Sequence, residues 1–507
     1  MMNINIAEIK TLGDLKAAGY KTRTIKDELR DNLIEHIRNG SEPFRGIHGY
    51  EHTVIPDLKK AILSRHNILL LGLRGQAKTR IARTLVSLLD EYIPAVKGSE
   101  LMDDPFNPVS VFARSQIVTH GDDTEIVWIH RDERYTEKLA TPDVSVADLI
   151  GDVDPIKAAA LKLPYSDERV IHYGLIPRSH RSIFVINELP DLQARIQVAL
   201  FNILQEEDIQ IRGFRMKLPL DIQFVFTANP EDYTNRGSIV TPLKDRIDSQ
   251  ILTHYPKEIA TAKAITKQEA RLHAAQREMI KCSPLIEDLL EQIAFEARKS
   301  EYIDEKSGVS ARLTISGYEN LHSSAELRAL KNNETHAFIR VSDLYEIVPS
   351  ITGKVELVYE GEQEGSAVVA HMLIAKAIRT VFQGYFPSPD RKGIEEDGKK
   401  EYAEILEWFA KGNTLDLMSH TDQKSYHSAL EAVPDLFRLV AKHVAGIDRE
   451  EQALFAEFLL HGMSEFSLIS KFGLSDKFVF RDMLSSMFTL DSAEDDDELD
   501  DFDNDRF

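Results

Sequence analysis

A strand, a glycine-bearing turn and a helix follow one another between His66 and Asp90, and this order constrains the fold more than any other feature. The four apolar residues 68–71 predict a buried strand, and apolar residues recur at helical spacing after the turn. The turn ends in Lys78 and Thr79, as in the template G-x-x-x-x-G-K-[ST]. In that template backbone N–H groups cradle phosphates, the lysine reaches the outer phosphates and the hydroxyl binds Mg²⁺. The segment therefore predicts a phosphate-binding loop.

The loop departs from the template at Ala77, which replaces the second glycine. Alanine tolerates the helical backbone angles that we expect there, although its methyl group crowds the phosphate. The alternative is an ordinary strand-to-helix turn with a surface lysine, and the flanking strand and helix argue against it. We therefore expect nucleotide contacts from the loop and the first helical turn: Gly72, Leu73, Arg74, Gly75, Gln76, Ala77, Lys78, Thr79 and Arg80.

Two further apolar runs, residues 183–186 and 222–227, predict buried strands that end in polar side chains. Asn187 and Glu188 follow the first run, and Asn229 follows the second. Strands that alternate with amphipathic helices indicate an α/β fold, with a parallel sheet covered by helices on both faces. Ligands bind at the carboxyl ends of such strands. Glu188 is therefore a candidate for orienting the water that attacks a nucleoside triphosphate, although an apolar run ending in Glu also arises by chance.

Composition limits the partners and the compartment. The chain has 507 residues and a formal net charge of −22, from 61 basic and 83 acidic residues, which argues against nucleic acid or an anionic membrane as the main partner. Cys282 is the only cysteine, so neither an intrachain disulfide nor a cysteine-built metal cluster is expected, and the 17 histidines show no metal-ligand spacing. Without a recognisable secretion signal or an apolar run of roughly 20 residues, we expect a cytoplasmic protein.

Five segments, in order and spacing, resemble the AAA+ ATPases of the MoxR and magnesium-chelatase I-subunit group. The resemblance covers roughly residues 46–359. The segments are GLRGQAKT (72–79), GLIPRSHRSIFVINELPDL (174–192), TANPEDY (227–233), PLKDRID (242–248) and SARLT (310–314).

The resemblance implies a role for each residue of the nucleotide site. Lys78 would bind the β and γ phosphates of ATP, and Thr79 would bind Mg²⁺. Glu188 would be the catalytic carboxylate, and Asn229 the sensor that positions water against the γ phosphate. Tyr50 lies in the region that packs on adenine in this group.

Two arginines complete the implied site. Arg246 resembles the finger that enters a neighbouring subunit's site, where such an arginine is worth about 10³ to 10⁵ in rate. Arg312 resembles the second sensor, which reaches from the helical lid. Taken alone, each would be a surface or salt-bridge arginine. A site shared between subunits implies a ring, expected to be a hexamer.

Asn187 is the departure that matters most. Members of the group carry Asp at this position, where it holds a water of the Mg²⁺ shell. A neutral amide accepts a hydrogen bond but lacks the charge that attracts a hard cation. We therefore expect weakened Mg²⁺ affinity and slow ATP turnover.

The expected domains combine this resemblance with the residue pattern. An N-terminal helical arm (1–45) precedes the AAA+ P-loop core (46–255), in which residues 109–112 are a candidate strand. An α-helical lid follows (256–386), with a small β element at 354–362. The remaining expected segments are a linker (387–398), a C-terminal helical domain (399–490) and an acidic disordered tail (491–507).

Three functions stay open at this stage. The first is a ring-forming ATPase that remodels a client protein, or loads it with metal, through a separate partner with a von Willebrand A domain. The second is the ATPase subunit of a magnesium or cobalt chelatase, and the third is a regulatory scaffold that binds ATP and hydrolyses it poorly. A transcriptional activator is disfavoured because no GAFTGA loop is present, and the helix-turn-helix cadence at 468–484 has too few basic residues to favour DNA contact.

Overall fold

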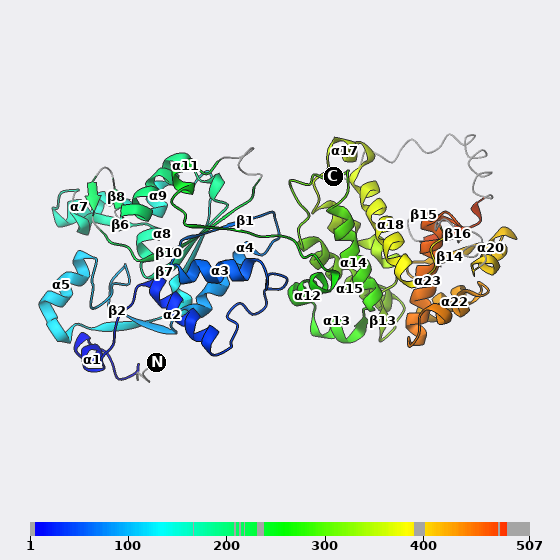
Figure 1. Ribbon diagram of the computed structural model, residues 1–507, viewed down its shortest axis with the longest axis horizontal. Coiled ribbons are helices and arrows are strands. Elements are labelled where there is room, and N and C mark those ends of the chain that lie inside the picture. Colours follow the sequence, from blue (N-terminus) through cyan, green and yellow to red (C-terminus); the bar gives the residue numbers. More distant parts are fainter. Residues whose placement is uncertain are drawn as a thin grey trace. The chain divides into compact units, whose positions relative to one another are not determined.

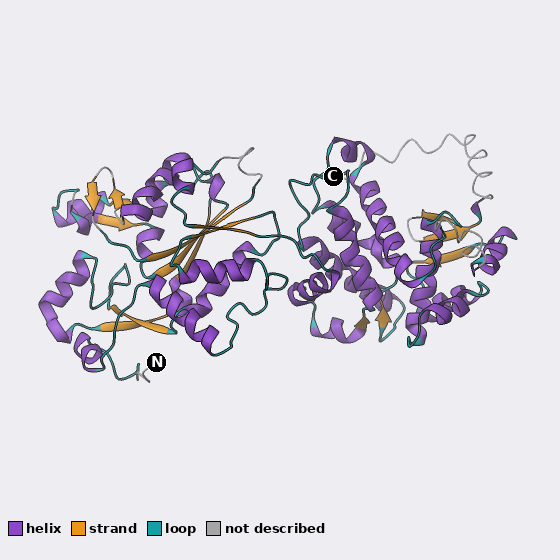
Figure 2. Ribbon diagram, viewed as in Figure 1, coloured by secondary structure: helices purple, strands orange, loops and turns teal. Residues whose placement is uncertain are grey.

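The computed structural model describes residues 6–165, 167–206, 209–211, 214–216, 218–230, 238–389, 401–474 and 477–483. The predicted acidic tail and most of the predicted linker lie outside these ranges. The chain divides into two compact units, residues 1–255 and 256–507 (Figure 1). The first holds a central sheet and the second is mainly helical (Figure 2). In the part of the chain described, no helix has the length and apolar character needed to cross a membrane.

A five-stranded parallel sheet organises the first unit, with the strand order β11-β1-β10-β7-β4. The apolar runs of β1, β7 and β10 are buried along their whole length, as expected for central strands of a parallel sheet. Leu71 pairs with Ala228 and Leu252, so neighbouring strands reach the same edge of the sheet. The strands are β1 (Ile68–Leu71), β4 (Tyr135–Leu139), β7 (Ser182–Asn187), β10 (Ile222–Ala228) and β11 (Ser249–Leu252).

Alternate residues of a strand point to opposite faces of the sheet, so each face presents apolar side chains, and helices cover both faces. Ile68 and Leu70 pack with α2 (Ile25–Arg38), α3 (Val54–Leu63) and α4 (Lys78–Thr84). Leu69 and Leu71 share the other core with α8 (Leu175–Arg178), α9 (Ala194–Glu206) and α11 (Thr241–Lys244). The predicted fold class, a P-loop α/β core followed by a helical region, is confirmed.

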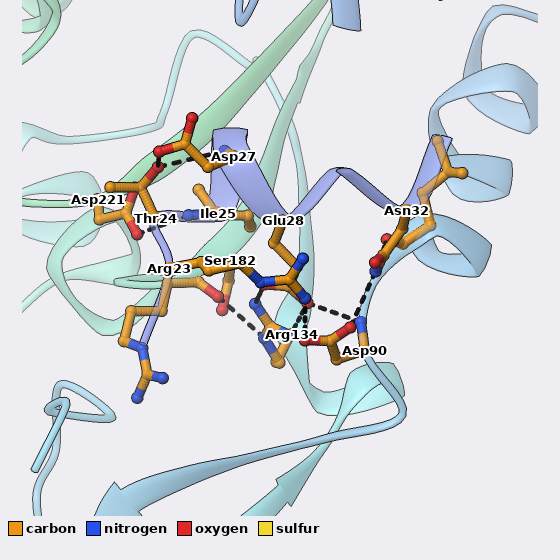
Figure 3. Close-up of polar contacts among 12 residues, drawn as sticks. Arg23, Thr24, Ile25, Asp27, Glu28, Asn32, Asp90, Arg134, Ser182 and Asp221 are labelled. Atoms are coloured by element: carbon orange, nitrogen blue, oxygen red, sulfur yellow. Dashed lines mark hydrogen bonds and ion pairs between the residues drawn. The ribbon is translucent and has the colours of Figure 1, made fainter. Parts of the chain in front are cut away.

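Helix α2 belongs to this core and is held by buried polar contacts (Figure 3). Arg134 donates to the two carboxylate oxygens of Glu28 at 2.7 and 2.6 Å, and both side chains are almost fully buried. Glu28 also accepts from the Asp90 N–H at 2.6 Å, and the Ile25 N–H donates to Asp221 at 2.8 Å. Helix α2 is thereby fixed to the segments that lead into β4 and β10.

Between α4 and β7 lie shorter elements, and one of them corrects a prediction. Residues 109–112 were expected to form a strand, but α5 (Val111–His120) begins there. Ser110 caps this helix by accepting from the Ala113 N–H at 3.0 Å, and Asp103 accepts from the Ser110 N–H at 2.8 Å, so local capping outweighs the apolar run. The other elements of this unit are α1 (Leu12–Ala17), β2 (Tyr92–Val96), β3 (Ile126–His130), α6 (Val146–Leu149), β5 (Gly151–Val153), α7 (Pro155–Leu161), β6 (Ile171–Tyr173), β8 (Ile209–Ile211) and β9 (Phe214–Met216).

The second unit is built on one hydrophobic core, to which both predicted segments, 256–386 and 399–490, contribute. Its long helices are α14 (Pro284–Ala297), α15 (Arg312–Lys331), α18 (Ser366–Tyr385) and α23 (Arg449–Glu465). The shorter elements are α12 (Ile259–Glu269), α13 (Ala274–Met279), β12 (Ile280–Lys281), β13 (Ala337–Phe338), α16 (Val348–Thr352), α17 (Tyr359–Glu364), α20 (Ala403–Ala410), β14 (Leu415–Met418), α21 (Gln423–Glu431), α22 (Leu436–His443), β15 (Ser470–Leu474) and β16 (Lys477–Arg481).

Two predictions in this unit are wrong. The suggested helix-turn-helix at 468–484 contains instead the antiparallel strands β15 and β16, which form a sheet with β14. The β-like segment 354–362 contributes one isolated bridge, between Leu357 and Ile303, and then enters α17. Within β15 the apolar residues Phe472 and Leu474 are two positions apart, which fits the period of a strand, and β16 contains the continuous apolar run 478–480.

Candidate functional site

The loop after β1 needs a glycine at its start. A Cβ on Gly72 would lie 2.0 Å from the Thr253 hydroxyl oxygen and 2.3 Å from the Gln76 side-chain oxygen. These two atoms are hydrogen-bonded to each other at 2.7 Å and are buried beneath the turn. Gly75, further along the loop, has a φ of 71°, which glycine adopts readily. The turn is therefore shaped by close packing from β11 and by glycine.

Ala77 corrects an expectation about this loop. Its φ of 57° and ψ of 17° place it in the left-handed region, whereas we expected helical angles. The chain turns sharply at this residue to enter α4, and the glycine of the template would supply the required freedom. For an L-residue this conformation costs about 1–2 kcal/mol. The loop therefore contains local backbone strain at Ala77.

Lys78, Asn229 and Glu188 form a continuous chain of hydrogen bonds. The Lys78 ammonium is buried and donates to the Gly72 carbonyl, to the Leu73 carbonyl at 3.0 Å and to the Asn229 side-chain oxygen at 2.5 Å. The Asn229 amide then donates to the Glu188 carboxylate at 3.0 Å. Asn229 and Glu188 directly follow β10 and β7, whereas Lys78 is the first residue of α4, after the loop that follows β1. The parallel register of the three strands brings these positions to one edge of the sheet. The fold thus brings together three residues that the sequence predicted.

Glu188 has a strained backbone. Its φ of 54° and ψ of 53° are left-handed, directly after β7, and its N–H donates to the Thr227 hydroxyl at 3.2 Å. Such a conformation costs about 1–3 kcal/mol in a residue other than glycine and tends to occur at functional sites. The strain and the bond to Thr227 fix the direction in which the Glu188 carboxylate leaves the strand.

Asn187 is held between two neighbouring strands. Its side-chain oxygen accepts from the Thr227 hydroxyl at 3.1 Å, and its amide nitrogen donates to Glu137 at 2.6 Å. A carboxylate can only accept, so the amide nitrogen must face Glu137. The sequence did not single out Glu137, which lies on β4 in a segment without an apolar run. Only its pairing with β7 would have revealed it.

Tyr50 lies behind the loop. It is buried, and its hydroxyl is 3.0 Å from the Gln76 carbonyl and 2.7 Å from the His254 carbonyl. Burial raises the pKa of the Tyr50 phenol, which therefore stays a neutral donor. From the same segment, the Tyr255 hydroxyl donates to the Arg74 carbonyl at 2.8 Å. Tyr50 thus supports the loop backbone, and its contact with adenine stays a prediction.

Three other predicted residues are not members of this chain of hydrogen bonds. Thr79 is the second residue of α4 and is partly exposed. Arg246 follows α11 and contacts α9, donating to Gln205 at 2.8 Å and lying 5.3 Å from the Phe201 ring centre. Arg312 is the exposed first residue of α15 in the second unit, so it is not among the residues that the first unit assembles.

Comparison with known proteins gives similarity only at the level of solved structures. No family model matches the chain, and no curated protein matches it. A Cytophaga hutchinsonii protein with a provisional ATPase assignment shares 18% identity over 72% of this chain and 98% of its own, with a TM-score of 0.30. The magnesium chelatase complex of BchI and BchD shares 19% over 63% and 98%, with a TM-score of 0.33. Hsp104 with ATPγS and casein shares 12% over 64% and 53%, with a TM-score of 0.37.

At these TM-scores the similarities identify neither a family nor an activity. The chemistry of the site must therefore be judged from its own residues. Among the described residues, no three His, Cys, Asp or Glu side chains are grouped to hold a metal by themselves. The Thr79 hydroxyl and the carboxylates of Glu137 and Glu188 are nevertheless oxygen donors, as Mg²⁺ prefers, and Mg²⁺ commonly binds through one or two carboxylates together with phosphate oxygens and water. The residues present fit Mg²⁺ that arrives with a nucleotide.

Proposed function

We propose that this chain is an AAA+ ATPase that binds ATP with Mg²⁺ at the loop of residues 72–79. The observation that carries the proposal is the hydrogen-bonded chain from Lys78 through Asn229 to Glu188. It joins the buried ammonium at the start of α4 to an amide and a carboxylate that follow the carboxyl ends of β10 and β7, where ligands of parallel sheets bind. Ordinary surface polar residues would not require this burial or this alignment.

Each residue then has a distinct task in hydrolysis. Lys78 exchanges its carbonyl contacts for the β and γ phosphate oxygens, and the backbone N–H groups of the loop bind the same phosphates. Glu188 orients the attacking water, while Asn229 links Glu188 to Lys78 and so couples the carboxylate to the phosphate position. Bound Mg²⁺ would neutralise the β and γ oxygens, with the Thr79 hydroxyl as its protein ligand.

We further propose that the chain acts as a ring, expected to be a hexamer, in the cytoplasm. Support comes from the position of Arg246, which follows α11, is partly exposed and donates to Gln205 on α9. A change of its side-chain conformation would let it reach a neighbouring subunit. In this proposal the ring remodels a client, or loads it with metal, through a separate protein with a von Willebrand A domain. The resemblance of the motif series supports that partner.

A second candidate function is a regulatory scaffold that binds ATP and hydrolyses it slowly. Asn187 favours it, because a neutral side chain occupies the position that would attract the metal. Turnover separates the two candidates. A motor requires ATP hydrolysis by the wild type that Glu188→Gln abolishes, whereas a scaffold binds ATP with nearly equal, very slow turnover in both proteins.

The test measures ATP binding and phosphate release by the full chain. We expect Lys78→Ala to lose binding by at least tenfold, and Glu188→Gln to retain binding while phosphate release falls by at least 100-fold. Lys97→Ala and Glu125→Gln are matched controls, because these residues form an exposed ion pair on the same unit. Failure of the wild type to bind ATP, or equal behaviour of Lys78→Ala and Lys97→Ala, would refute the proposed site.

A further inference from the structure

The Asn187 amide and the Glu137 carboxylate form a pair at the edge of the sheet. β4 and β7 are adjacent and parallel, with Leu139 paired to Asn187, so Glu137 lies two residues before the end of its strand. The Asn187 amide nitrogen donates to a carboxylate oxygen of Glu137 at 2.6 Å. Of the two side chains, only Glu137 has a carboxylate.

An aspartate at position 187 would be incompatible with this contact. Its second oxygen would take the place of the amide nitrogen, directly against the Glu137 carboxylate, and two carboxylates so close cannot both ionise freely. The other oxygen of residue 187 is already occupied, because it accepts from Thr227. A neutral side chain at position 187 therefore avoids repulsion with a carboxylate at position 137.

The second carboxylate oxygen of Glu137 is ion-paired with Arg83 on α4, the helix that begins at the phosphate loop. Arg83 on α4 donates to its second oxygen at 3.0 and 2.9 Å, and the Tyr135 hydroxyl donates to the same oxygen at 3.1 Å. Arg83 lies four residues after Thr79, so the two side chains leave the same face of α4. Burial and the negative charge of Glu137 together raise the pKa of the Tyr135 phenol. Glu137 therefore lies between the end of β7 and the helix that begins at the phosphate loop.

We propose that Glu137, on β4, supplies the carboxylate charge that acts on Mg²⁺ through its water shell, in place of an acidic residue at 187. Mg²⁺ usually keeps several waters, so a carboxylate can act on it without direct contact. Glu137 is then a positioning residue, and Asn187 is its neutral partner. The inference rests on the proposed function, because it concerns Mg²⁺ bound together with ATP.

The test exchanges the two residues. Binding of a fluorescent ATP analogue to the full chain is titrated with Mg²⁺, for wild type, Glu137→Gln, Asn187→Asp and the double variant Glu137→Gln/Asn187→Asp. We expect Glu137→Gln to raise the half-saturating Mg²⁺ concentration at least tenfold while nucleotide binding without Mg²⁺ stays within twofold. The double variant, which restores one carboxylate and one amide, should return to within threefold of wild type. Asn187→Asp alone should lower Tm, because both residues then compete as carboxylates.

Several outcomes would overturn the inference. If Glu137→Gln changes Tm but leaves the Mg²⁺ dependence within twofold of wild type, Glu137 has only a structural role. If Asn187→Asp alone binds Mg²⁺ more tightly with an unchanged Tm, residue 187 faces the metal and Glu137 does not. Glu125→Gln serves as a control for the loss of one exposed carboxylate. A wild type that binds no nucleotide refutes the proposed function itself, whereas a wild type that responds to Mg²⁺ while Glu137→Gln matches it refutes this inference alone.

Discussion

The buried ion pair of Glu28 and Arg134 gives the most direct test of how helix α2 is attached to the sheet. Arg134 donates three hydrogen bonds, two to Glu28 at 2.7 and 2.6 Å and one to the Arg181 carbonyl at 3.0 Å. The side chains of Arg134 and Glu28 are 1% and 4% exposed, so little water could replace a lost partner. The substitution Arg134→Met therefore leaves a buried carboxylate without its cation.

The expected magnitude follows from that burial. Breaking a buried pair by removing one partner costs about 3–5 kcal/mol, because the remaining charge stays desolvated. The exposed pair of Lys97 and Glu125 should contribute no more than about 1 kcal/mol. The double variant Glu28→Gln/Arg134→Met removes both charges and keeps an acceptor for the Asp90 N–H, so it should recover most of the loss.

Hydrogen exchange of the α2 amides measures this effect locally, which is preferable because a chain of two units need not unfold in one step. A loss of 3 kcal/mol or more corresponds to at least about 100-fold faster exchange. Lys97→Met should change the same amides by less than about fivefold. If Arg134→Met exchanges no faster than Lys97→Met, or if the double variant is as unstable as the single one, the buried charge does not fix the helix.

Three further predictions concern the loop, the sheet and the ring. Ala77→Gly should relieve the strain of the left-handed backbone and raise the free energy of unfolding by up to about 1 kcal/mol. The control Ala82→Gly, inside α4, should lower it by about 1 kcal/mol. A urea titration in which both substitutions destabilise the chain equally would contradict the strain at Ala77. Burial raises the pKa of Asp221 from 3.8 to about 6, so its contribution to stability is full below pH 4 and is lost as the pH rises to 6. Relative to Asp221→Asn, the wild type should therefore lose on the order of 2 kcal/mol between pH 4 and pH 6, and parallel unfolding curves of the two proteins would refute this. Arg246→Ala should keep ATP binding and lose at least 100-fold in phosphate release. Mixing it with Glu188→Gln should restore part of the release, because one subunit would supply the arginine and another the carboxylate, and no restoration at any ratio would argue against a shared site.

The central strands could be predicted from the sequence because their burial leaves a continuous apolar signal. β1, β7 and β10 each show it, and the polar residues that follow them meet because parallel strands end at one edge. β4 is only partly buried and has no such run, so Glu137 was missed although it contacts Asn187. That contact joins residues 50 positions apart, and no local pattern encodes it.

Other predictions were wrong where hydrogen bonding or backbone conformation opposed the structure that the spacing of apolar residues suggested. Ser110 and Asp103 start a helix where residues 109–112 suggested a strand. The left-handed backbone of Ala77 depends on the turn between β1 and α4, and alanine gives no local sign of it. The hairpin of β15 and β16 was missed because a few apolar residues can match helical spacing by chance, while strand pairing with β14 decides the outcome.

The attachment of α2 has a consequence for the distant end of the sheet. Arg134, Arg181 and Asp221 immediately precede β4, β7 and β10, and all three contact α2 or one another. The opposite ends of β7 and β10 deliver Glu188 and Asn229, about 20 Å away for strands of six and seven residues. A truncation or a binding protein that displaces α2 would therefore disturb the starts of these strands, and with them the placement of Glu188 and Asn229 at the far edge of the sheet.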